Sequence, residues 1–72
     1  MLDVMPSISG EKLRRVRDMR LLSQRELAER AGLSPTTILK LEAGRVEEPH
    51  PRTVRKLAEA LEVDPAELVR GD

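Results

Sequence analysis

Two helix boundaries that lie three residues apart restrict the fold of this chain more than any other feature. Ser23 and Glu26 have the spacing of a capping box, in which each side chain bonds the other residue's free backbone N–H at a helix start. Gly32 suits the left-handed conformation that often ends a helix. Ser34 and Pro35 then supply an N-cap and a first helical residue whose missing N–H costs nothing. Two helices joined by so short a turn form a helix-turn-helix by spacing alone.

Composition and further caps predict that the rest of the chain is helical as well. The hydrophobic residues, 39% of the chain, are mostly leucine, valine and alanine, and none is aromatic. Leucine and alanine favour helices, whereas strands draw on aromatic side chains, so the expected fold class is all-α. A chain of 72 residues holds one small core, which we expect over residues 10–70 after a flexible segment over 1–9. The five helices are expected to start near Gly10, Gln24, Pro35, Pro51 and Pro65, and the short last one to end near Val69.

Two charged residues lie on helix faces that are otherwise apolar. Arg17 shares a stripe with Leu13 and Val16, and Glu42 shares one with Ile38 and Leu41. A buried charge without a partner is very costly, so the sequence predicts an ion pair between Arg17 and Glu42. The alternative is that both lie at the edges of their stripes and reach water separately.

The charges are unevenly distributed although the net charge is zero. Residues 11–45 carry nine basic against five acidic side chains, and residues 46–72 carry four against seven. One half of the chain could therefore face a polyanion. The chain has one histidine, no cysteine and no glycine-rich phosphate loop, so we expect no enzyme, no metal site and no cofactor. No stretch reads as a signal peptide or as a membrane span, which leaves the cytoplasm as the simplest location.

The stretch from Arg17 to Arg45 resembles the phage repressor/Cro type (XRE-like) of helix-turn-helix protein. The shared marks are the arginine seven residues before glutamine, the Ser-Gln opening, Leu-Ala, the turn glycine, Leu-Ser, and Ile-x-x-Leu-Glu-x-Gly. The resemblance continues to the terminal Glu-Leu and so covers about residues 11–69. It implies a compact, lambda repressor-like five-helix bundle and a sequence-specific transcriptional regulator. It further implies a repressor that binds a palindromic operator in double-stranded DNA as a homodimer, with the third helix in the major groove.

The resemblance also assigns candidate site residues. The first, second and sixth residues of the third helix would face base edges, but Pro35 offers no side-chain hydrogen bond. Leu39 has no role in this interpretation, and Arg14 and Arg20 stay unassigned. The alternative for each candidate is an ordinary solvated surface residue. The expected base contacts come from Thr36, Thr37 and Lys40, and the expected phosphate contacts from Gln24, Arg25, Arg45 and Arg52.

A protein-interaction module on the same fold is the competing hypothesis. The acidic residues between Glu47 and Glu67 would suit a basic partner, such as a toxin held by an antitoxin or a component of the transcription machinery. An antitoxin that also binds its own operator would combine both functions. DNA binding should weaken steeply as salt rises, whereas a mainly apolar protein contact should respond weakly.

Overall fold

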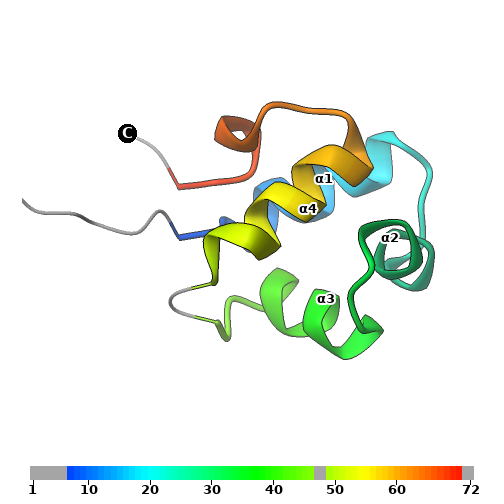
Figure 1. Ribbon diagram of the computed structural model, residues 1–72, viewed down its shortest axis with the longest axis horizontal. Helices are drawn as coiled ribbons and strands as arrows, with labels where there is room; N and C mark the ends of the chain where they lie inside the picture. The colour runs from blue at the N-terminus through cyan, green and yellow to red at the C-terminus, as the bar shows by residue number, and fades with distance from the viewer. Residues whose placement is uncertain (1–6, 47–48, 71–72) are drawn as a thin grey trace, which may run out of the picture.

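The computed structural model describes residues 7–46 and 49–70, and helices account for most of them. In Figure 1, α3 lies along the lower edge of the molecule, and the chain passes from its end through a loop into α4. The helix-turn-helix pair is α2 and α3, with Gly32 in the left-handed conformation between them (φ 69°). The elements are α1 (Gly10–Met19), α2 (Gln24–Ala31), α3 (Pro35–Glu42), α4 (Pro51–Leu61) and a 3₁₀ turn, η1 (Pro65–Glu67).

The expected caps are formed by the expected side chains. The Glu26 backbone N–H donates to Ser23 Oγ at 3.0 Å, and the Ser23 backbone N–H donates to Glu26 Oε1 at 2.8 Å. Ser34 Oγ accepts from the backbone N–H of Thr37 at 3.1 Å, and Pro35 is the first residue of α3. These local bonds fix where the two helices begin, and Gly32 in the left-handed conformation ends α2, so the length of the turn between the helices is set by the local sequence.

The short fifth helix, expected from Pro65 to near Val69, is present only as a 3₁₀ turn over Pro65–Glu67, so the count of five helices is not confirmed. Asp64 does cap the element, since its Oδ1 accepts from the Ala66 backbone N–H at 2.9 Å. The helix stops after one 3₁₀ turn because the following backbone pairs elsewhere: Leu68 O accepts from the Ser9 backbone N–H at 2.8 Å. The described residues therefore form four α-helices and one short 3₁₀ turn.

Because of this backbone pairing, the folded domain begins earlier in the sequence than expected. Ile8 forms an isolated antiparallel bridge with Val69 and is only 4% exposed. The Arg70 backbone N–H donates to Ser7 O at 2.7 Å on the other side of the bridge. Ser7 to Ser9 thus belong to the folded domain rather than to the expected flexible segment over 1–9, of which residues 1–6 lie outside the described part.

The core is aliphatic and is shared by all four helices. Leu68, near the end of the described chain, is fully buried in this core. No helix among the described residues is long and apolar enough to cross a membrane. The buried apolar residues are Ile8, Leu13, Leu22, Leu27, Ala28, Ala31, Ile38, Leu41, Val54, Leu57, Ala58, Leu61 and Leu68.

Gly10 lets the start of α1 approach the end of α3. A Cβ atom at this position would lie 2.8 Å from the carbonyl oxygen of Leu41, and it would also collide with the carbonyl oxygen of Glu42. Only glycine fits so close to another backbone. This contact sets the N-terminal end of α1 against the C-terminal end of α3 and helps to hold α3 in place.

Candidate nucleic-acid interface

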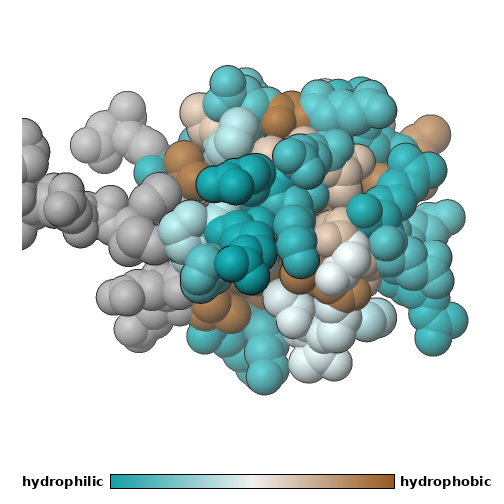
Figure 2. Space-filling view, viewed as in Figure 1, coloured by the Kyte–Doolittle hydropathy of each residue, from teal (hydrophilic) through white to brown (hydrophobic). Residues whose placement is uncertain are grey.

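The outward face of α3 presents a short row of small and basic side chains. Thr36 and Lys40 are exposed and lie four residues apart, on one side of the helix. Ile38 and Leu41 on the opposite side are 0% and 2% exposed and anchor α3 to the core. Figure 2 shows a pale, weakly polar surface in the lower part of the view, where α3 lies. The core thus fixes which α3 side chains face outward.

Thr37 is placed differently from Thr36. It is only partly exposed, and its Oγ1 lies 3.1 Å from Ser34 Oγ, the N-cap hydroxyl of α3. Its hydroxyl is therefore used in the cap at the start of the helix. Among the three expected base-contacting residues, the structure brings Thr36 and Lys40 together on one face and sets Thr37 aside from them.

Arg17 and Glu42 form the expected ion pair between α1 and α3. Arg17 Nε lies 2.5 Å from Glu42 Oε2, and Arg17 Nη2 donates to Glu42 Oε1 at 3.1 Å. Both side chains are largely buried, with 11% and 6% of their surfaces exposed. The side-chain hydrogen bond to Glu42 is the main cause that raises the pKa of Arg17 above its ordinary value.

Arg17 also holds the turn that precedes α2. Its Nη1 donates to the carbonyl oxygen of Leu22 at 2.7 Å, inside the protein, and lies 3.3 Å from Asp18 Oδ1. One guanidinium group thereby joins α1, the turn before α2, and α3. A planar group with five N–H donors is suited to bridging several acceptors in this way.

Gln24 is brought to the same carboxylate, a contact that sequence analysis did not anticipate. Its Nε2 donates to Glu42 Oε1 at 3.0 Å. This bond sets the first residue of α2 beside the last residue of α3, and an open hollow of about 330 Å³ forms there. The hollow is lined by Arg14, Arg17, Gln24, Leu39, Glu42 and Ala43.

The remaining basic candidates differ in how they are placed. Arg25 and Arg52 are exposed in the first turns of α2 and α4, and Arg45 is exposed just after α3. Arg20 is used elsewhere, because its Nε donates to the carbonyl oxygen of Leu61 at 2.9 Å and its Nη2 to that of Glu62 at 3.3 Å. Arg20 therefore joins α1 to the end of α4 rather than serving the α3 face.

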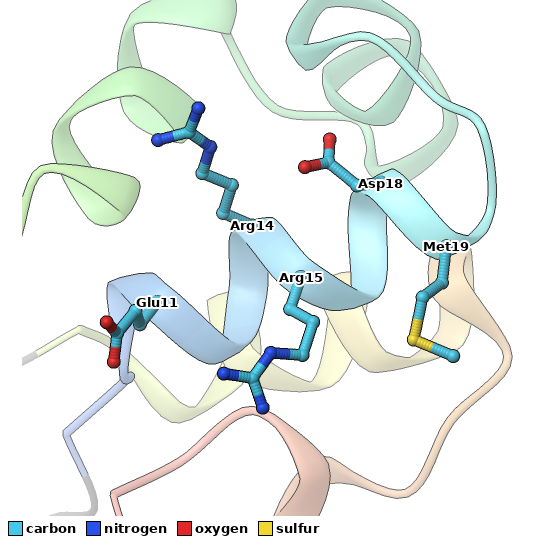
Figure 3. Close-up of a pocket in the computed structure, with 5 residues that line it drawn as sticks. All are labelled: Glu11, Arg14, Arg15, Asp18 and Met19. Carbon is cyan, nitrogen blue, oxygen red and sulfur yellow. The ribbon is translucent and has the colours of Figure 1, made fainter.

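Arg14 is a basic side chain that the sequence left unassigned. In Figure 3 it points from α1 toward α3, whereas Arg15 points to the opposite side of α1. Arg14 lines the hollow beside Gln24 and also a shallow one along α1 with Glu11, Arg15, Asp18 and Met19. Its place on one side of an amphipathic helix was the available sequence signal, but only the packing of α1 on α3 tells which side matters.

Within residues 7–46 and 49–70, no group of histidine, cysteine, aspartate or glutamate side chains is arranged to hold a metal ion. His50 acts as the N-cap of α4, since its Nδ1 accepts from the Arg52 backbone N–H at 3.1 Å.

The chain is similar to known helix-turn-helix proteins in sequence and in fold. The chain is 43% identical over 54 residues to the HTH-type transcriptional repressor RghR of Bacillus subtilis. The matched residues cover 75% of this chain and 40% of RghR. The match thus spans less than half the length of that relative.

Two solved structures agree closely in fold. The restriction-modification controller protein C.AhdI from Aeromonas hydrophila is 34% identical, with a TM-score of 0.77 over 81% of this chain and 86% of that one. The P22 c2 repressor, solved in complex with a synthetic operator, is 30% identical, with a TM-score of 0.78 over 88% and 94% of the two chains. The sequence pattern of the helix-turn-helix family matches residues 13–68, and on that match the chain is a member of this XRE-type family.

Proposed function

We propose that this protein is a sequence-specific, double-stranded DNA-binding regulator of transcription that places α3 in the major groove. The observation that carries this proposal is the 3.0 Å hydrogen bond from Gln24 to Glu42, which sets the first turn of α2 beside α3. In a helix-turn-helix protein the second helix enters the groove while the first crosses the DNA backbone. The N-terminus of α2 lies beside the last residue of α3 here, and this placement supports the proposed docking.

Lys40 and Thr36 are the proposed base-reading residues. A lysine donates to O6 and N7 of guanine, and a threonine hydroxyl donates to or accepts from several base edges. Both side chains are exposed on one face of α3. Thr37 would contribute less than the sequence suggested, because its hydroxyl lies 3.1 Å from Ser34 Oγ at the cap.

Phosphate contacts are proposed for Gln24, Arg25, Arg45 and Arg52. Gln24 uses one amide hydrogen on Glu42 and retains a second for a phosphate oxygen, beside the free backbone N–H groups of the α2 N-terminus. The three arginines would supply the salt-dependent part of the affinity. We add Arg14 to this group, because it lines the same hollow as Gln24.

A repressor that binds a palindromic operator as a homodimer is the finer form of the proposal. RghR is named a transcriptional repressor, and the P22 c2 repressor was solved with an operator, which supports this direction. Two copies would present their α3 helices about 34 Å apart, one turn of B-DNA, to two half-sites.

Selection of bound sequences from random duplex DNA, followed by binding measurements at two salt concentrations, tests the proposal. We expect one palindromic motif, and we expect Lys40→Ala and Thr36→Ala to relax its sequence preference at particular base pairs. Arg45→Ala should weaken all sequences alike and lower the slope of log affinity against log salt by about 1. Arg15→Ala is the control for the loss of one positive charge. Arg15 lies on the side of α1 opposite to Arg14 and points away from α3 (Figure 3), so its removal should leave DNA binding unchanged.

Failure to select any sequence, together with salt-insensitive or absent binding, would overturn the proposal. That result would favour the competing hypothesis of a protein partner, which a pull-down would then test. The absence of enzymatic activity and of a cofactor stays a prediction of the sequence.

A further inference from the structure

Leu39 is a large apolar side chain on α3 that the core does not use. It is 55% exposed, whereas the other apolar residues of α3, Ile38 and Leu41, are almost completely buried. The other large apolar residues that the structure describes as exposed, Met19 and Leu21, lie at the end of α1 and in the turn that follows. Leu39 alone among them belongs to the helix that we propose to enter the major groove.

The position of Leu39 on α3 places it next to the proposed base-reading residues. At about 100° per residue, Lys40 lies about 40° to one side of Thr36 and Leu39 about 60° to the other. Leu39 therefore stands on the side of α3 that faces the hollow with Gln24 and Arg14. It lies between the row that would read bases and the side chains that would hold a phosphate.

The major groove offers a single apolar group to such a side chain. Base edges there carry hydrogen-bond donors and acceptors, apart from the C5-methyl group of thymine. We propose that Leu39 is a specificity-determining residue that contacts the methyl group of a thymine in each half-site, on the strand whose phosphate Gln24 holds. This inference rests on the proposed function and adds to it a thymine preference at a base pair other than those read by Thr36 and Lys40.

Thymine-to-uracil substitution in the selected site isolates this contact, because uracil differs from thymine only by the missing methyl group. Each thymine would be replaced singly, in both half-sites, and binding measured by fluorescence anisotropy. Loss of one buried methyl contact corresponds to about a fourfold loss of affinity per half-site. We expect the wild-type protein to show this loss at one symmetry-related position, and Leu39→Ala to bind the thymine and uracil sites equally there.

Three variants make the result specific to Leu39. Leu39→Met keeps an apolar side chain and should retain the preference for thymine. Leu21→Ala shortens a leucine that is even more exposed than Leu39 but lies outside α3, and it should leave DNA binding unchanged. Thr36→Ala should keep the thymine preference at the Leu39 position, because the two side chains point to different parts of the groove. Since Leu39 is exposed, its variants should unfold at the temperature of the wild type, which circular dichroism verifies.

Several outcomes would overturn this inference without touching the proposed function. A uniform weakening of all sequences by Leu39→Ala would show a contact with the DNA backbone, and an unchanged thymine preference would show no contact. Loss of that preference in Thr36→Ala instead would assign the methyl contact to threonine. If no sequence were selected at all, or if Lys40→Ala and Thr36→Ala left the selected motif unchanged, the proposed function would fail first and this inference with it.

Discussion

Replacing Arg17 by methionine should destabilise the domain more than any other single substitution in the interface. The change leaves the Glu42 carboxylate, whose side chain is 6% exposed, with the Gln24 amide as its remaining donor among the contacts described above. It also removes the buried hydrogen bond that the carbonyl oxygen of Leu22 accepts from Arg17 Nη1. An unpartnered buried charge is the costly part of this change, because its hydration is not restored.

The expected loss follows from the three hydrogen bonds that Arg17 makes to Glu42 and Leu22. Breaking a buried pair by removing one partner costs roughly 3–5 kcal/mol, and we expect about 4 kcal/mol here. At 0.05–0.15 kcal/mol per residue, a domain of this size has a total stability of roughly 4–11 kcal/mol. The variant should therefore be close to unfolding at 37 °C, with its Tm lowered by roughly 16–32 °C.

Thermal and urea unfolding would be followed by far-UV circular dichroism, because the chain has no tryptophan or tyrosine. The double variant Arg17→Met/Glu42→Leu removes both charges and should recover much of the loss. A loss below about 1 kcal/mol in Arg17→Met, or a double variant no more stable than the single one, would refute the reasoning that burial makes this pair obligatory.

The other predictions concern the helix boundaries and the turns. Gly10→Ala should lower the free energy of unfolding by about 1–3 kcal/mol, because its Cβ would collide with the backbone of α3; an unchanged urea midpoint would contradict this. Leu21→Gly should raise the free energy of unfolding by up to about 1 kcal/mol, because Leu21 has φ 59°, a left-handed conformation that favours glycine. A lower urea midpoint in this variant would count against backbone strain at Leu21. Hydrogen bonds from Ser23 hold the pKa of Glu26 below its ordinary value of 4.5. The ionised Glu26 carboxylate should therefore stabilise the folded state above pH 4.5, and this contribution should fade as the pH falls through the lowered pKa. Ser23→Ala should return the pKa toward 4.5 in an NMR titration and cost about 1 kcal/mol; a pKa that does not move would assign the shift to another cause.

Local signals predicted α2 and α3 well, because their boundaries are set by side chains that bond the neighbouring backbone. Ser23 and Glu26 carry this information within four residues. The fifth helix failed for the opposite reason: Asp64 and Pro65 start a helix locally, but the backbone after it pairs with a segment some sixty residues earlier. No propensity near residue 65 reports that competition.

The candidate site shows the same division between local and distant information. Arg17 could be paired with Glu42 from sequence because two misplaced charges of opposite sign leave few economical solutions. The third partner, Gln24, could not be found this way. A glutamine at a helix start is usually solvated, so the sequence does not indicate that its side chain bonds Glu42. Thr37 stays a predicted base-contacting residue, but its position beside Thr36 gave no indication that its hydroxyl would also lie near Ser34 Oγ.

The pairing of Ser7 with Arg70 makes the described chain almost a closed ring. The backbone atoms that meet there are 2.7 Å apart, so a short peptide linker could join the two ends with little loss of conformational entropy. A circularly permuted protein could then be opened in the loop between α3 and α4, leaving every helix intact. In such a protein α4 and η1 would precede α1 in the chain. Folding of this protein would mean that the helices reach the same arrangement when they are synthesised in a different order.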